Sequence, residues 1–245
     1  MDSGFYAAMT GLVARSQALD TAAANLANAA TPGYRAEREY FRSALLGPDA
    51  LDSQLGRTVN NFGLLGGDRL SMDQGALTAT GNPLDLAIEG EGFFQVQTAN
   101  GIRYTRDGGF HRSPTGQLVT AAGEPVLSTA GLAIQLPPGE VTVGADGVVS
   151  VAGGVVSTVG VFTFPHGAEM TPEGANRYVA PKGVAPQLSK KAEIHQGAIE
   201  AANQDVIQGS LDLIVMQRQA EMMQRALTIF HTEFNKTASE DLPRV

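Results

Sequence analysis

Apolar positions divide the chain into a helical start, a strand-rich middle and a helical end. Residues 3–30 are rich in alanine and leucine. Their bulky members recur at intervals of seven, at Phe5, Leu12, Leu19 and Leu26. Such a repeat predicts a helix with one apolar stripe. Thr31-Pro32-Gly33 predicts the end of this helix, because the residue before a proline is pushed out of the α region and glycine suits the position beyond a helix.

The C-terminal residues predict a second, longer helix. Asn203 is expected to cap its start, and Asp205 follows in the first turn, where the helix dipole favours an acid. Apolar residues then alternate in steps of three and four, at Leu213, Met216, Ala220, Met223, Leu227, Phe230 and Phe234. A second apolar stripe comprises Ile207, Leu211, Ile214, Met222 and Ile229. We expect this helix to pack against neighbours on more than one side, because one neighbour cannot cover both stripes.

The residues between the helices predict an antiparallel β domain. Apolar and acidic positions alternate from Leu84 to Glu89, which is the pattern of a half-buried strand with its acids in water. Apolar runs flank Asn100-Gly101 and Asp146-Gly147, and these dipeptides supply the positive φ that tight hairpin turns require. The middle of the chain is therefore predicted to be a meander of short strands.

Together these elements predict an α+β fold. The N- and C-terminal helices are expected to form a coiled-coil-like assembly domain, with a central antiparallel β-rich domain inserted between them. The predicted segments are an N-terminal assembly helix over residues 1–34, an extended connector over 35–82, the central β domain over 83–192, and a C-terminal assembly helix over 193–245 that pairs with 1–34. The alternative is that two ordinary helices pack on the β domain.

Composition narrows the classes of function. A chain of 245 residues with 43% hydrophobic content can build a core. With 25 acidic and 17 basic residues the net charge is -8, so nucleic acid is not an expected partner. The absence of cysteine excludes disulfides and thiolate metal sites. Direct membrane insertion is not expected, since charges or glycines interrupt every apolar run, and Asp2 stands where a secretory signal needs a basic residue.

The polar residues predict no catalytic or metal site and no cofactor. The four histidines, His111, His166, His195 and His231, lack the spacing of metal ligands. A carboxylate pair for glycoside or peptidoglycan cleavage could come from Asp85, Glu89, Glu91 and Asp107. Acids on the outer face of a strand ordinarily only face water, so we expect a structural protein. The competing hypothesis is a β-rich cell-wall hydrolase or carbohydrate-binding module.

Four sequence blocks carry a family resemblance. In residues 25–34 two asparagines three apart precede Thr-Pro-Gly-Tyr. Further blocks span residues 80–94 and 104–110, and Gln217-Arg218 follows Asn203 and Val206 in the last helix. In their order and spacing these blocks resemble the bacterial flagellar rod and hook family. The tail departs from the family pattern, because Ala220 stands where an aromatic residue is common after Gln-Arg.

The resemblance implies a structural subunit of the flagellar basal-body rod, which crosses the periplasm and transmits torque from motor to hook. Its expected partners are copies of itself, related rod and hook proteins, and the flagellar type III export apparatus. The short connector favours a proximal rod position, and a distal rod or hook subunit is the alternative.

The predicted assembly interface combines the helix stripes with the first block. Asn25 and Asn28 lie one turn apart, where their amides could bond to neighbouring backbones or only end the helix. The full set is Phe5, Leu12, Leu19, Asn25, Leu26, Asn28, Thr31, Pro32, Gly33, Leu213, Met216, Gln217, Arg218, Ala220, Met223, Leu227, Phe230 and Phe234.

Overall fold

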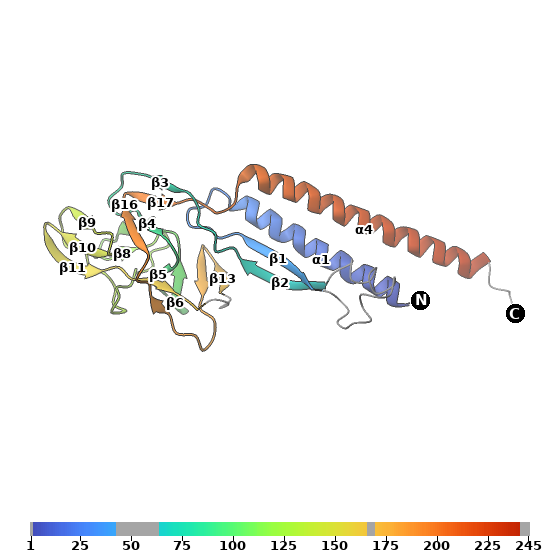
Figure 1. Ribbon diagram of the computed structural model, residues 1–245, viewed down its shortest axis with the longest axis horizontal. Coiled ribbons are helices and arrows are strands. Elements are labelled where there is room, and N and C mark those ends of the chain that lie inside the picture. The colour runs from blue at the N-terminus through green and yellow to red at the C-terminus, as the bar shows by residue number, and fades with distance from the viewer. Residues whose placement is uncertain (1, 43–63, 166–169, 241–245) are drawn as a thin grey trace. The chain divides into compact units, whose positions relative to one another are not determined.

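The computed structural model describes residues 2–42, 64–165 and 170–240, which belong to two compact units (Figure 1). Unit 1 contains the described residues of Met1–Ala27, Glu37–Arg69 and Val206–Val245. Unit 2 contains those of Asn28–Ala36 and Leu70–Asp205. Residues 43–63 of the predicted connector lie outside the described residues.

Unit 1 is built on two helices that pack side by side and run in opposite directions (Figure 1). They are α1, Asp2–Ala27, and α4, Val206–Glu240. Among the described side chains of α1, the buried residues are Asn25 and three small ones, Gly11, Ala14 and Ala18. On α4 the buried positions are Gly209, Ala220 and Leu227. Small residues at steps of three and four leave room for a second backbone, so the two helices can approach closely.

The opposite faces of both helices are exposed. On α1, Met9 is 43% exposed and Val13 is 52% exposed. On α4, the whole second stripe is exposed: Ile207, Leu211, Ile214, Met222 and Ile229. Within one chain α1 therefore leaves the second stripe of α4 uncovered, as expected for a helix with two apolar stripes. Neither helix is long and apolar enough, over the residues described, to cross a membrane.

The predicted fold class needs correction. The fold is α+β, but the expected coiled-coil-like assembly domain with an inserted β domain is wrong. A coiled-coil seam buries bulky residues of the seven-residue repeat, whereas Leu12, Leu19 and Leu26 are only half-buried and the small side chains of α1 are buried instead. Most described elements are β-strands, with one helix toward each end of the chain. Unit 1 also includes β1, Glu37–Arg42, and most of β2, Leu64–Leu70, which pair with each other.

Unit 2 consists of short strands in several small sheets (Figure 1). A six-stranded sheet has the order β13 (Thr171–Gly174), β14 (Arg177–Val179), β6 (Gly101–Thr105), β5 (Phe93–Thr98), β12 (Val161–Thr163) and β15 (Gln187–Leu188). A three-stranded sheet has the order β11 (Gly154–Thr158), β10 (Val148–Val151) and β9 (Val141–Val143). The remaining pairs are β16 (Glu193–Gln196) with β4 (Leu86–Glu89), β17 (Ala198–Glu200) with β3 (Leu77–Ala79), and β7 (His111–Arg112) with β8 (Leu118–Val119).

Both predicted hairpins are confirmed. β5 and β6 pair antiparallel around Asn100-Gly101, and Gly101 has a φ of 100°. β9 and β10 pair antiparallel around Asp146-Gly147, and Gly147 has a φ of 81°. The predicted half-buried strand is wrong for β4, because Leu86, Ala87 and Ile88 are all buried and only Glu89 is exposed. Other parts of unit 2 thus cover both faces of β4.

Two apolar clusters form the core of unit 2, and neighbouring residues of β5 contribute to each. Side chains alternate across a strand, so Phe93 and Phe94 point to opposite faces. Phe94 packs edge-on against Phe110, with 5.2 Å between ring centroids. Phe93 packs edge-on against Tyr178, with 5.7 Å between centroids. The larger cluster around Phe94 contains residues from β4, β5, β8, β9, β10, β12 and β16.

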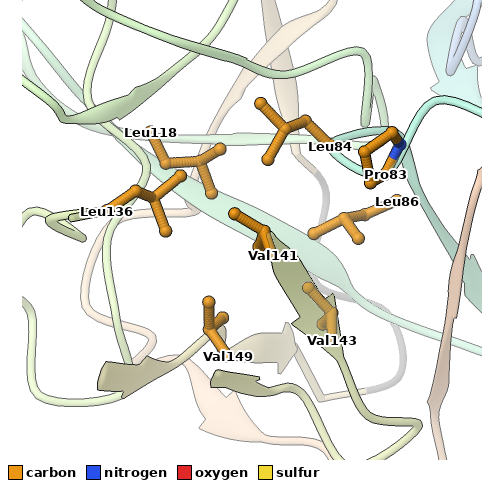
Figure 2. Close-up of a pocket in the computed structure, with 8 residues that line it drawn as sticks. All are labelled: Pro83, Leu84, Leu86, Leu118, Leu136, Val141, Val143 and Val149. Carbon is orange, nitrogen blue, oxygen red and sulfur yellow. The ribbon is translucent and has the colours of Figure 1, made fainter. Parts of the chain in front are cut away.

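The larger cluster contains one small cavity of about 10 Å³ (Figure 2). Apolar side chains line it: Pro83, Leu84, Leu86, Leu118, Leu136, Val141, Val143 and Val149. This volume is about that of one water-sized sphere. The cavity is therefore a packing defect and not a ligand site.

Candidate functional site

Glu200, at the end of β17, is the centre of a buried network in unit 2. Its side chain is 1% exposed, accepts two hydrogen bonds and forms a further ion pair. The donors are the backbone N–H of Gly75 at 2.8 Å and Nη1 of Arg106 at 2.9 Å, and the ion-pair partner is Nη2 of Arg35 at 3.0 Å. These partners come from segments far apart in sequence. Glu200 therefore joins the segment after α1, the segment after β2 and the end of β6.

The two arginines of this network are nearly inaccessible, with Arg35 2% exposed and Arg106 3% exposed. Burial lowers the pKa of Arg35, and it lowers the pKa of Arg106 to about 10, while Glu200 opposes both shifts. A guanidinium of this basicity keeps its charge at neutral pH. Arg106 also donates from Nη2 to the carbonyl of Gly90 at 2.5 Å. Glu200 is thus the main carboxylate that compensates two buried positive charges.

The Thr-Pro-Gly block contacts the same part of unit 2. The N–H of Gly33 donates to the carbonyl of Glu200 at 2.7 Å. Gly33 has a φ of 68°, and a Cβ at this position would overlap the backbone of Arg106 and Asp107. Only glycine meets both requirements. The Pro32 carbonyl accepts a bond from Nδ2 of Asn176 at 2.8 Å.

Asn203 has a role that the sequence did not predict. It does not cap α4, which begins at Val206. Its Oδ1 accepts from the N–H of Ala36 at 2.7 Å, and its Nδ2 donates to the carbonyls of Ser71 and Asp73, each at 3.0 Å. One amide therefore bonds to the segments that follow α1 and β2. All its side-chain partners are backbone groups, so no pattern of partner residues could have revealed it.

Asn25 and Asn28 make different contacts. In unit 1, Nδ2 of Asn25 donates to the carbonyl of Glu37 at 2.8 Å, and the N–H of Glu37 donates to Oδ1 of Asn25 at 2.9 Å. In unit 2, Oδ1 of Asn28 accepts from Oγ1 of Thr31 at 3.3 Å, in the turn after α1. One amide thus bonds to a neighbouring strand, and the other lies in the turn that ends the helix.

The remaining residues of the predicted interface lie on several faces of the helices. Among those on α4, Ala220 and Leu227 are buried, Leu213, Met216 and Met223 are half-buried, and Gln217 and Arg218 are exposed. The side chains of Phe5, Phe230 and Phe234 are not among those described. Their part in an interface between chains stays a prediction.

Three of the four acids considered for hydrolysis, Asp85, Glu89 and Asp107, have hydrogen-bond or ion-pair partners. Asp85 accepts a bond from Oγ1 of Thr80 at 2.6 Å, and Glu89 lies 2.5 Å from Nε2 of His195. Asp107 is half-buried in a turn, and Glu91 is exposed. Within the described residues, no three acidic or histidine side chains are grouped as metal ligands. These contacts shape turns and strand surfaces.

Comparison with known proteins connects both units to one family. Residues 5–35 match the model "Flagella basal body rod protein", and residues 87–151 match "Flagellar hook protein FlgE/F/G D1 domain". The chain is 36% identical to the flagellar basal-body rod protein FlgF of Caulobacter vibrioides over 248 residues, covering 100% of both chains. It is 33% identical to FlgF of Mesorhizobium japonicum, covering 90% of each. It is 29% identical to the rod protein FlgG of Bacillus subtilis, covering 91% of this chain and 93% of that protein.

These similarities extend over both helices and the β unit. The match over residues 5–35 includes Gly33 and Arg35, which contact Glu200 in the buried network. Identity at this level along a whole chain shows common descent. The chain therefore belongs to the flagellar basal-body rod protein family, a family of structural proteins and not of enzymes.

Proposed function

We propose that this chain is a subunit of the proximal flagellar rod that assembles with copies of itself and with related rod and hook proteins to transmit torque. Membership of the rod family supports the structural role. Export through the flagellar type III apparatus is part of the same proposal. The main support for assembly through the helices is the exposed apolar side of α4.

We call this side the outer face of α4. Its apolar residues are Ile207, Leu211, Ile214, Met222 and Ile229, and they are 50% to 74% exposed. Burying a large apolar side chain stabilises a structure by about 1.5–3 kcal/mol. A helix that leaves five such residues in water therefore gains considerably when another chain covers them. Assembly along this face explains why the chain maintains an apolar stripe that its own fold does not bury.

The buried network around Glu200 and the neighbouring Asn203 suit the transmission of mechanical load. The chain leaves unit 2 after Ala36, enters it again at Leu70, and leaves it after Asp205. Asn203 bonds to Ala36 and to Ser71, close to these three of the four points where the chain passes between the units. A force applied to any of these three chain segments is thus shared by all of them through Asn203 and the nearby network of Glu200. The hydrogen bonds and buried ion pairs there resist separation of the segments.

Substitution of the outer face of α4 tests this proposal. The double variant Leu211→Gln/Ile214→Gln should fold, because both side chains are exposed, but should assemble poorly. The control is Leu132→Gln/Val155→Gln in unit 2, whose side chains are 69% and 73% exposed. Each gene replaces the native one in a motile strain. Swimming and the number of complete rods in isolated basal bodies should fall only for the α4 variant, and equal numbers in both strains would contradict the proposal.

Electron microscopy of basal bodies that carry a labelled chain tests the position. Label near the motor end of the rod supports a proximal subunit. Label near or beyond the hook junction would instead support a distal rod or hook subunit.

A further inference from the structure

Among the side chains that the structure describes, one side of α1 carries a single charge. At 100° per residue, six exposed residues of α1 fall on one side of the helix. They are Met9, Val13, Ser16, Asp20, Ala24 and Ala27, and we call them the outer face of α1. Asp20 is the charged member of this set and has no ion-pair or hydrogen-bond partner among the described residues. Its neighbours on this face toward the C-terminus are alanines.

The outer face of α4 carries two charges of the opposite sign and one acid, Glu221, which lies seven residues after Ile214. Arg218 and Arg225 fall within the apolar stripe, because they lie four and eleven residues after Ile214. Both arginines are exposed, and neither has an ion pair with a described residue. An apolar stripe with guanidinium groups in it fits a partner helix that is apolar and carries a carboxylate at the matching position.

We propose that the outer face of α1 in one copy of this chain packs against the outer face of α4 in the next copy, with Asp20 paired to Arg218. This contact rests on the proposed function, since it names the surfaces through which copies assemble. The partner is a second copy because the chain itself supplies both the acid, Asp20, and a matching base, Arg218. A chain with a net charge of -8 repels its copies in general, so a contact in which opposite charges meet is favoured over others.

The residues around the pair also match when the helices run antiparallel. Ala24 and Ala27 lie four and seven residues after Asp20, and Ile214 and Leu211 lie four and seven residues before Arg218. Small side chains on α1 therefore face large ones on α4, which allows close approach. In the other direction Met9, eleven residues before Asp20, faces Ile229, eleven residues after Arg218, and Val13 faces the aliphatic stem of Arg225.

Contact between two different faces has a consequence for the assembly. A heterologous interface of this kind leaves one face free on each end copy, so that further copies can add. A subunit with both faces can therefore extend a helical array, as a rod requires. A self-complementary contact would instead stop at a dimer.

Cysteine cross-linking tests the pair directly, because the chain contains no cysteine. The chain with Asp20→Cys and Arg218→Cys is expressed in place of the native chain, and isolated basal bodies are oxidised. We expect disulfide-linked dimers and higher multimers of this chain. The control combines Asp20→Cys with Gln217→Cys, which is exposed but about 100° around the helix from Arg218. Cross-links that are equally abundant in the control, or that join this chain to a protein of another size, would overturn the proposal.

Charge reversal provides an independent measurement. Asp20→Arg and Arg218→Asp each place like charges together, and each should reduce the number of complete rods by about tenfold. The double reversal restores the pair and should recover most of that loss. Circular dichroism of the purified variants shows whether they fold normally. If Leu211→Gln/Ile214→Gln prevents assembly but the double reversal gives no recovery and no specific cross-link forms, the proposed function stands and this pairing is wrong.

Discussion

The side-chain amide of Asn25 pairs with the backbone of Glu37 through two hydrogen bonds, as a neighbouring strand would. Nδ2 donates to the Glu37 carbonyl at 2.8 Å, and Oδ1 accepts from its N–H at 2.9 Å. Asn25 is 8% exposed. The last turns of α1 are therefore tied to the first residue of β1 within unit 1. This contact lets a residue from the helical block specify where the following strand begins.

Replacing this amide should loosen the start of β1. Asn25→Ala leaves the N–H and carbonyl of Glu37 without these partners, which costs about 1–3 kcal/mol. Hydrogen exchange at the Glu37 amide should accelerate accordingly. Gln17→Ala is the matched control, because Gln17 is exposed on α1. Unchanged protection of Glu37 in Asn25→Ala would show that the amide contributes little.

Loss of the Glu200 carboxylate should lower the free energy of unfolding more than Asn25→Ala does. Glu200→Gln removes the main counter-charge of the buried Arg35 and Arg106, at a cost of about 3–5 kcal/mol. Urea denaturation followed by circular dichroism measures the change. The control is Glu173→Gln, which breaks an exposed pair with Arg103 and should have little effect. Similar losses in both variants would mean that burial does not distinguish the two pairs.

Two glycines with similar positive φ values allow the cost of backbone strain to be distinguished from the cost of a Cβ clash. Gly33 has a φ of 68° and Gly81 a φ of 75°, but only at Gly33 would a Cβ meet other atoms within 4 Å. Gly81→Ala should cost about 1–2 kcal/mol through the left-handed conformation alone. Gly33→Ala should cost clearly more, because the Arg106 and Asp107 backbone must move. Thermal unfolding of the two variants compares these costs, and equal shifts would argue against the close contact.

The carboxyl of Asp107 should make stability depend on pH. Burial raises its pKa, the hydrogen bond from Gly109 opposes the rise, and Asp85 adds to it. A carboxyl with a raised folded-state pKa contributes stability that is present below its unfolded pKa and lost as pH rises through the folded pKa. Asp107→Asn keeps an acceptor and avoids that loss. The variant should therefore be more stable than the native chain at neutral pH.

Urea midpoints at a series of pH values measure this difference. The gain should shrink as the pH falls through the titration of Asp107, since the native carboxyl is then also uncharged. A gain of the same size at every pH would assign the effect to packing.

Filling the cavity of Figure 2 should stabilise unit 2. Val149 lines the cavity and is 1% exposed. Val149→Ile adds one methylene to it and keeps a β-branched side chain, and we expect a gain of about 1 kcal/mol. Val155→Ile on exposed β11 should leave the unfolding midpoint unchanged. A loss of stability in Val149→Ile would show that the surrounding side chains cannot accommodate the added volume.

Much of the local structure could be predicted from the sequence. Asn100-Gly101 and Asp146-Gly147 specify hairpins because their geometry depends on a few neighbouring residues. The stripes of α4 are likewise visible from their spacing. The prediction failed on which stripe of α1 is buried, because a repeat of leucines and a repeat of small residues share the same helix. Packing favoured Gly11, Ala14 and Ala18, which allow the closer approach.

By itself the sequence determined the order of helix, strands and helix, the hairpin turns, and the family to which the chain belongs. These properties depend on residues close together in the chain or on short ordered blocks. Only the tertiary structure decided that Glu200 holds Arg35 and Arg106, and that Asn203 bonds to the segments after α1 and β2. Such contacts join residues far apart in sequence, and several use backbone atoms that every residue carries. They exist only once the fold has brought the segments together.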